Sequence, residues 1–447
     1  KIYANAYVSV EFLKGLKYKL NLTPDFQFYR YNDYNGVYDF GLATNQLTSV
    51  TEQQTRRRNV LVENLLTFDQ TFGDHKISVL AGYTYQDSRY RYMQGSGQGM
   101  PTGIMEIDAA AQGLAVSGNS SRSVLTSILG RAFYSYKNKY LLTATIRRDG
   151  SSKFGSSHRY GNFPSVSAGW NVAEENFVKD NVSWLDQLKL RGGYGVLGNQ
   201  EISDYQFVSV VTTGINYPDG KSGLIQGAFP KTFANPDIKW EETAMTNVGI
   251  DFMALRNRLT LTADWYVKNT KDILLNVPIP ISTGGANDPV RNAGKIRNQG
   301  VEFNIGWNES LNKDFSYGIG FLGTYNKNEV VEMGAESQAI TGGAIHGGTY
   351  TSKTLAGYPI GGFWLIPVDG YFNSVEEVQA YQKDGVLIQP SAEPGDIRFK
   401  DTNNDGTIND EDRVYCGSPF PKFTYSINGN LTYKQVDFSI GFQGVTG

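Results

Sequence analysis

The sequence predicts an all-β fold, part of a large antiparallel transmembrane β-barrel, and three observations carry this prediction. Apolar and polar residues alternate with period two along many short segments, which a helix with one apolar face does not do. The connections between these segments alternate between tight turns and long stretches rich in Gly, Asn and Ser. Aromatic residues make up 13% of the chain and often lie near segment ends, where a membrane-spanning strand meets the lipid interfaces.

The period-two alternation is clearest near residue 300. Val301, Phe303 and Ile305 fall on one face of an extended segment, while Glu302 and Asn304 fall on the other. The same pattern recurs in segments 4–12, 77–85, 140–146, 244–254, 259–268, 423–433 and 436–442. We count about fourteen such segments of about ten residues, the length with which a tilted strand spans a bilayer.

The connections fall into two kinds. Tight turns are expected at 14–15, 73–75, 137–139, 256–258, 312–313 and 434–435, and long loops at 31–57, 91–121, 198–238, 277–292 and 330–420. Short turns on one side and long extracellular loops on the other are typical of an outer-membrane barrel. One short-side connection, 170–188, is long enough to hold a short helix. Pro164 would interrupt a ladder, so it is predicted at a strand end.

The two faces favour a barrel over a soluble β-sandwich. Aromatics mark the strand ends at Trp265, Trp307, Tyr325, Tyr433 and Phe442. The face opposite the apolar one is small and polar, which suits a wet lumen and not a close-packed core. Strand edges left open in lipid would carry unpaired backbone groups. We therefore expect the chain to be a fragment, with outer-membrane lipid around it and further strands closing the ring.

Composition excludes several other classes. A net charge of -3 gives no sign of nucleic-acid binding, and a single cysteine, Cys416, cannot form an internal disulfide. The sequence contains no run of 18 apolar residues, so it predicts no transmembrane helix. The chain begins at Lys1 in an expected strand, so we expect any signal peptide to lie outside it.

Several sequence blocks resemble those of the SusC/RagA family of TonB-dependent outer-membrane transporters. They recur in the family's order as RDGSSKFG (148–155), RYGNFPSVSAGW (159–170), LRGGYG (190–195), GNQ (198–200), NPDIKWE (235–241), NAGKIRNQGVE (292–302) and GDIRFKD (395–401). Each block by itself is weak evidence for the resemblance. Together the blocks cover most of the chain and are specific to the family.

The resemblance implies a Gram-negative outer-membrane barrel of about 22 strands with an N-terminal plug. It also implies energy coupling through the TonB complex, a SusD-like surface lipoprotein as partner, and import of oligosaccharides or oligopeptides. The chain carries neither a plug nor a TonB box. We therefore expect residues 1–447 to be a barrel segment from the middle and later part of such a protein, with the plug domain and the barrel ends missing.

The sharpest local motif is the twelve-residue run 401–412 within the long loop region 330–420. It has the ligand spacing of an EF-hand calcium loop, with Gly406 at the sharp turn. The expected ligands are Asp401, Asn403, Asp405, Thr407 and Asp412. Position 12 is Asp where Glu is usual, and the residues before the loop predict a strand. The alternative is an Asx-rich turn satisfied by its own backbone. Bound Ca²⁺ would be structural, and no other cofactor is expected.

No catalytic site is predicted. His75, His158 and His346 lack metal-ligand spacing, and no nucleophile elbow accompanies them. Run 150–155 has the glycine spacing of a phosphate loop without its Lys-Ser/Thr. The loop aromatics Tyr217, Tyr350, Trp364 and Tyr371 either stack on a ligand or pack the loops together.

Active import of an oligomeric nutrient is therefore the leading interpretation. A passive or structural outer-membrane barrel is the alternative, and an outer-membrane hydrolase is a third.

Overall fold

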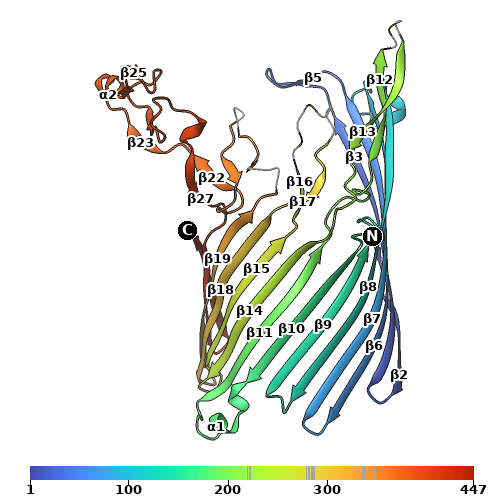
Figure 1. Ribbon diagram of the computed structural model, residues 1–447, viewed down its shortest axis with the longest axis vertical. Coiled ribbons are helices and arrows are strands. Elements are labelled where there is room, and N and C mark those ends of the chain that lie inside the picture. Colours follow the sequence, from blue (N-terminus) through green and yellow to red (C-terminus); the bar gives the residue numbers. More distant parts are fainter. Residues whose placement is uncertain are drawn as a thin grey trace. The chain divides into compact units, whose positions relative to one another are not determined.

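The computed structural model describes residues 1–218, 220, 223–277, 279, 282, 287–334, 339–345 and 349–447. Its long elements are strands of one antiparallel sheet (Figure 1). Among the described residues this sheet has 15 strands in the order β1-β3-β6-β7-β8-β9-β10-β11-β14-β15-β18-β19-β28-β29, with β2 also paired to β3. The all-β, antiparallel fold is thus confirmed. No helix of the described part is long and apolar enough to cross a membrane.

The chain divides into two compact units, and β11 (Leu185–Asn199) and β14 (Glu241–Ala254) contribute to both. The first unit holds residues 1–176, 191–244 and 274–292. Its other strands in the large sheet are β1 (Ile2–Tyr3), β2 (Ala6–Leu13), β3 (Leu16–Asn35), β6 (Ser49–Phe72), β7 (His75–Gln98), β8 (Gln112–Tyr136), β9 (Tyr140–Ser151) and β10 (Tyr160–Asn171). Its small hairpins are β4 (Tyr38–Asp39) with β5 (Thr44–Asn45), β12 (Val210–Pro218) with β13 (Leu224–Thr232), and β16 (Leu274–Asn276) with β17 (Val290–Asn292).

The second unit holds residues 177–190, 245–273 and 293–447. Its large-sheet strands are β15 (Leu259–Lys271), β18 (Lys295–Asn312), β19 (Phe315–Glu332), β28 (Phe423–Tyr433) and β29 (Val436–Thr446). Between β19 and β28 lie β20 (Ile340–Thr341), β21 (Ser352–Thr354), β22 (Gly362–Leu365), β23 (Val368–Tyr371), α2 (Val375–Ala380), β24 (Gln382–Lys383), β25 (Val386–Leu387), β26 (Ile397–Phe399), the 3₁₀ turn η5 (Asp410–Asp412) and β27 (Val414–Gly417). This is the region predicted as the long loop 330–420.

Cross-strand partners show that each unit has one apolar face. In the second unit, Ile305 lies opposite Leu261 on one neighbour and Phe321 on the other. Phe321 lies opposite Ile427, which in turn lies opposite Phe442. Directly opposed residues share a face, so this row confirms the apolar face predicted from period two. A matching row in the first unit runs through Tyr18, Leu66, Ala81, Gly130, Ile146 and Pro164.

Many of these apolar side chains are exposed, as a lipid-facing surface requires. Ile305 is 40% exposed and Ile128 is 63% exposed, whereas core side chains of a soluble sandwich would be buried. In each unit, we call the side of the large sheet that carries these rows the apolar face, and the other side the polar face.

The strands are longer than predicted. β6 and β7 each have 24 residues and β8 has 25, against the expected length of about ten. The expected loops 31–57 and 91–121 therefore belong largely to strands. Beyond the bilayer both faces of a strand meet water, so pairing continues while the apolar alternation stops.

The prediction for Pro164 was wrong. It lies inside β10, opposite Ile146 of β9, rather than at a strand end. Proline removes a single ladder donor, and in an antiparallel pair only alternate residues exchange both bonds with a given neighbour. The ladder here continues on both sides of the missing N–H.

The predicted tight turns are confirmed within a residue or two. The turn between β8 and β9 spans residues 137–139, and Lys137 at φ 52° and Asn138 at φ 54° adopt the left-handed conformation that tight hairpin turns use. Gly15 in the first turn has φ 85°, and a Cβ there would lie 2.2 Å from the Asp69 carbonyl oxygen. Glycine is therefore required at that turn.

The long short-side connection contains the expected helix, as the 3₁₀ turn η2 (Val172–Glu174) and α1 (Asn176–Lys179). Glu175 ties this segment to the sheet, because it accepts hydrogen bonds from Tyr140 Oη at 2.6 Å and Trp170 Nε1 at 3.1 Å. Lys139 Nζ adds a third contact at 3.3 Å. The Tyr140 hydroxyl is the main cause that lowers the pKa of the Glu175 carboxyl.

The two faces predict opposite responses to a new charge. Ile305→Arg places a cation near the middle of the apolar face and should destabilise the membrane-inserted protein by about 2–4 kcal/mol. Asn304→Arg, one residue away on the polar face, is the control and should cost far less. Urea unfolding of the full-length protein in phospholipid vesicles measures both. Equal losses for the two variants would contradict the assignment of the faces.

Candidate functional site

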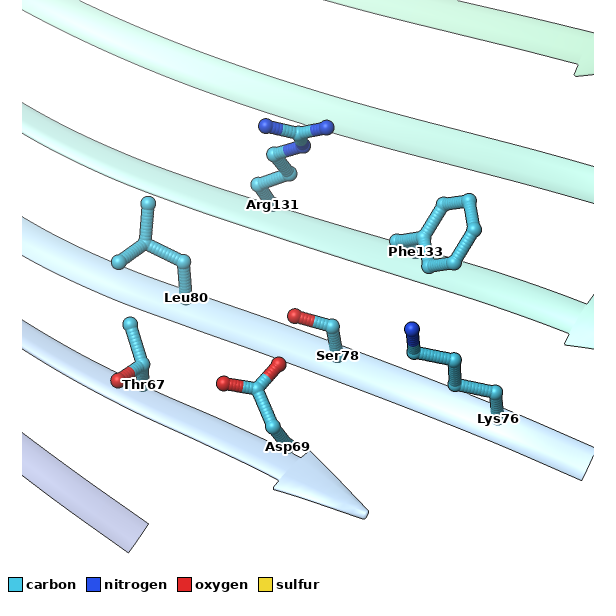
Figure 2. Close-up of a pocket in the computed structure, with 7 residues that line it drawn as sticks. All are labelled: Thr67, Asp69, Lys76, Ser78, Leu80, Arg131 and Phe133. Atoms are coloured by element: carbon cyan, nitrogen blue, oxygen red, sulfur yellow. The ribbon is translucent and has the colours of Figure 1, made fainter. Parts of the chain in front are cut away.

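A hollow on the polar face of the first unit is the candidate ligand-contact surface. It has a volume of about 390 Å³. Figure 2 shows its seven lining residues on one side of three adjacent strands, namely Thr67 and Asp69 of β6, Lys76, Ser78 and Leu80 of β7, and Arg131 and Phe133 of β8. The sheet register accounts for this arrangement, because Asp69 lies opposite Ser78 and Leu80 lies opposite Arg131.

The hollow lies close to the tight turn that joins β6 to β7. Asp69, Lys76 and Arg131 are exposed, so both signs of charge are available beside apolar Leu80 and Phe133. Such a surface can hydrogen-bond peptide or sugar groups and can pair with charged ends. Nothing in it forms a nucleophile and base pair, so the hollow is suited to contact and not to covalent chemistry.

A second hollow of about 570 Å³ lies in the loop region of the second unit. Its lining runs through residues 388–392 and includes Asp396, Ile397, Phe399 and Ile408. Gln389 is already engaged, because its Nε2 donates to the Ile397 carbonyl and its Oε1 accepts from the Phe399 N–H. The Gln389 side chain therefore holds this hollow in shape by bonding to the backbone of its own loop.

Several of the sequence blocks meet in one hydrophobic cluster, which we call the motif core. Phe154, Phe163, Ile238 and Trp240 are buried together, with Val196 packed against them. The Trp240 ring lies 5.1 Å from the Phe154 ring and 5.3 Å from the Phe163 ring, centroid to centroid. Blocks 148–155, 159–170 and 235–241 thus supply the packing that fixes the segments following β9 and preceding β14.

Polar bonds close the motif core at its edges. Trp240 Nε1 donates to the Arg159 carbonyl oxygen at 3.1 Å. Asn292 Oδ1 accepts from the Lys239 N–H and its Nδ2 donates to the Lys239 carbonyl, both at 2.8 Å. Glu241 accepts from Asn199 Nδ2 at 3.1 Å, so blocks far apart in sequence are joined directly.

Glycines of the blocks make room for Phe163. A Cβ at Gly161 would lie 2.4 Å from Phe163 Cζ, and one at Gly198 would lie 2.1 Å from the same atom. A Cβ at Gly155 would lie 2.9 Å from the Pro236 carbonyl oxygen, which explains the glycine at the end of run 150–155. Sequence reasoning missed this core, although blocks 148–155 and 159–170 combine glycines with the aromatic residues Phe154 and Phe163 and that signal was present.

The five expected calcium ligands lie in one loop, but their oxygens are held by hydrogen bonds within that loop. Asp401 Oδ2 accepts from the Gly406 N–H at 2.8 Å, and Asp405 Oδ1 accepts from the Thr407 N–H at 2.8 Å. The Thr407 N–H is the main cause that lowers the pKa of Asp405. Asn403 Oδ1 accepts from the Asp405 N–H at 3.0 Å.

Asp412, the expected closing ligand, is fully buried and turned inward. Its Oδ1 accepts from the Thr402 N–H at 2.7 Å and its Oδ2 from the Asn409 N–H at 2.9 Å. In the part of the chain that the structure describes, no group of three or more His, Cys, Asp or Glu side chains is arranged to hold a metal ion. Calcium binding would require Asp412 to exchange these bonds for the ion, so the site remains a prediction.

The remaining singled-out residues lie apart from one another. His75 Nδ1 contacts Tyr134 Oη at 2.8 Å, His158 contacts Ser157, and His346 lies outside the described residues. Cys416 is free and exposed. Trp364 packs against Tyr358 and Tyr415, as the loop-packing alternative predicts, whereas Tyr217, Tyr350 and Tyr371 are about half exposed or more.

Comparison with known proteins gives consistent matches. The family described as "TonB dependent receptor-like, beta-barrel" matches residues 4–445. "TonB-dependent receptor P39" of Formosa agariphila is 31% identical over 98% of this chain and 44% of its own length. "TonB-dependent receptor SusC" of Bacteroides thetaiotaomicron is 34% identical over 72% of this chain and 31% of its own length.

Among solved structures, "Structure of the RagAB peptide transporter" superposes with a TM-score of 0.81 at 21% identity. The superposition covers 98% of this chain and 47% of that one. The likeness shows a shared fold. The chain spans less than half the length of the curated relatives it matches.

The motif core predicts a sharp steric effect. Gly198→Ala forces Phe163 to shift and should destabilise the protein by about 1–3 kcal/mol. Faster protease cleavage within 200–240 should accompany it. Gly320→Ala is the control, because its added Cβ would lie 3.9 Å from the nearest atom. Urea unfolding and timed proteolysis of the full-length protein measure both, and an unaffected Gly198→Ala protein would contradict the packing.

Proposed function

The chain belongs to the TonB-dependent receptor-like β-barrel family, and from that membership we propose that it forms the wall of an active nutrient importer. It is SusC/RagA-like and lies in the outer membrane, as members of the family do. The apolar face then meets lipid and the polar face lines the lumen. The family and the location follow from the comparisons. The uptake activity of the whole protein, the class of its cargo and the identity of its partners are our proposals.

The observation that carries the proposal is the wet, charged hollow on the lumen-facing wall. Asp69 of β6 and Arg131 of β8 stand exposed on either side of β7 near the short-turn end, which is periplasmic in an outer-membrane barrel. A solute that leaves toward the periplasm, or a plug that moves to release it, would meet this surface. Mixed charge favours weak, exchangeable contact over tight capture, as transport requires.

We propose an oligopeptide or oligosaccharide as cargo, with TonB as energy source and a SusD-like lipoprotein as lid. The solved neighbour named a peptide transporter supports the peptide class, and the relative named SusC supports the same receptor type. The exposed loop residues Tyr217, Tyr350 and Tyr371 are suited to stack on sugar rings or peptide side chains. We assign no covalent chemistry to the chain. Of the two histidines that the structure describes, His75 contacts Tyr134 and His158 contacts Ser157, and neither pair has a third group that orients the histidine as in a catalytic triad.

Uptake by cells that carry the full-length protein tests the proposal. Removal of TonB should abolish accumulation of labelled oligopeptides or oligosaccharides while the amount of inserted protein stays constant. A passive barrel would retain uptake without TonB, which would contradict active import. Parallel assays with the two cargo classes decide between them.

The hollow makes a more local prediction. Replacement of both Asp69 and Arg131 by Ala should lower the uptake rate several-fold, because the exchangeable polar contacts are lost. Asn304→Ala on the polar face of the second unit is the matched control. Uptake kinetics at equal protein levels measure the effect, and an unchanged rate in the double variant would argue against this surface.

We also propose that run 401–412 binds Ca²⁺ and thereby stabilises the long loop. Asp401, Asn403, Asp405, Thr407 and Asp412 have the spacing of ligands in such loops, and the Gly406 turn at φ 92° is in place. The ion would supply no chemistry. It would replace hydrogen bonds within the loop by stronger coordination and so reduce the chain's freedom.

The calcium proposal predicts that roughly 0.1–1 mM Ca²⁺ slows proteolysis of region 330–420, and that a chelator reverses this. Asp405→Asn should weaken the effect, because the amide oxygen keeps a ligand at this position but the ligand charge is lost. Asp410→Asn is the control, because Asp410 belongs to the same loop but is 87% exposed and paired with Arg413. The same cleavage rate with and without Ca²⁺ would contradict the proposal.

A further inference from the structure

A group of arginines lies on the apolar face of the first unit, just beyond its apolar rows. On β7 these rows run from Ile77 to Tyr85, close to the roughly nine to eleven residues with which a tilted strand crosses a bilayer. The next residues on that face toward the long loops are Asp87, Arg89 and Arg91. With their neighbours on β6 and β8 they form what we call the arginine patch, made of Arg56, Arg58, Arg89, Arg91 and Arg122.

The sheet register sets these side chains directly against one another. Arg58 lies opposite Arg89, which lies opposite Arg122 on the next strand. In the adjacent outward row, Arg56 lies opposite Arg91. All five side chains are exposed, and the three strands lie side by side (Figure 1). Like charges in directly opposed positions destabilise a sheet unless a counter-charge lies between them.

The protein supplies little of that counter-charge. Asp87 contacts Arg89 at 3.2 Å and Arg122 at 3.0 Å. Within the described part of the chain, Arg56, Arg58 and Arg91 form no ion pair. The corresponding band of the second unit is different, because Lys327 pairs with Glu329 at 3.0 Å and Lys295 pairs with Glu332. An excess of positive charge is therefore a local feature of the patch.

The dimensions of the patch fit phosphate groups. Strands lie about 4.8 Å apart and alternate residues about 6.6 Å apart, so the five side chains start from an area of roughly 10 by 7 Å. Guanidinium groups bind phosphate with two parallel hydrogen bonds, and neighbouring arginines can share one anion. Phe26 and Phe28 of β3 lie opposite Arg58 and Arg56 and extend the patch with aromatic surface.

The position along the strand specifies the kind of anion. The patch faces away from the lumen, continues the lipid-facing rows, and lies on the side of the long loops, which is extracellular in an outer-membrane barrel. We propose that the arginine patch binds the phosphate groups of a phosphorylated glycolipid of the outer leaflet, whose acyl chains lie along the apolar rows. This inference needs the outer-membrane location and not transport, so it can fail while the proposed function holds.

Native mass spectrometry of the detergent-solubilised full-length protein tests the proposal, with bisphosphorylated lipid A, dephosphorylated lipid A and inorganic phosphate as probes. Wild-type protein should bind the bisphosphorylated form at least tenfold more tightly than the dephosphorylated form. R56Q/R91Q should lose at least tenfold, since each arginine near an anionic surface contributes roughly fivefold. This variant leaves the Asp87 pairs intact. K295Q/K327Q is the control from the balanced band and should bind as wild type.

Equal binding of the two lipid A forms, or undiminished binding by R56Q/R91Q, would overturn the proposal. So would inorganic phosphate competing as well as lipid A, which would indicate a simple anion site. Loss of a co-purifying acidic protein in R56Q/R91Q, with lipid A binding unchanged, would overturn it in favour of a protein partner. Heat-modifiable gel migration confirms folding, and the single variant R91Q, expected to lose about fivefold, replaces the double variant if that does not insert.

Discussion

The structure depends on one constraint, which is that every backbone donor and acceptor in hydrocarbon must be paired within the protein. Long antiparallel strands meet this demand by residue-for-residue register, as between β6 and β7 from Ser49 to Phe72. Once the register is set, each side chain has a fixed face and fixed neighbours. The lipid-facing rows, the polar wall and the arginine patch are all consequences of that pairing.

The same constraint explains where packing is found. Membrane-spanning strands need no hydrophobic core between sheets, so buried side chains are few and local. The motif core is the main such cluster in the first unit, and it gathers segments that leave the sheet and return to it. Phe163 projects from the polar face, and Gly161 and Gly198 accommodate its ring. Blocks 148–155, 159–170 and 235–241 therefore serve to hold loops against the wall.

Charge is distributed unequally between the two faces. On the polar face, acids and bases such as Asp69 and Arg131 occur together and can serve a passing solute. On the apolar face, the arginine patch of the first unit lies at the long-loop end of the apolar rows. There the second unit balances its lysines with glutamates, while the first unit leaves arginines in excess. The side chains that face the lumen, the lipid and the extracellular end of the wall thus differ in charge and polarity.

The sequence by itself determined the fold class, the faces of the membrane-spanning segments and the tight turns. Val301, Phe303 and Ile305 alternate with polar residues because one side of their strand meets lipid. This alternation is visible directly in the sequence. Only the tertiary structure decided the true strand lengths, the place of Pro164, the meeting of Phe154 with Trp240, and the opposition of Arg58 and Arg89. Beyond the bilayer both faces of a strand meet water, so the alternation disappears, and contacts between distant segments follow from a register that no local pattern encodes.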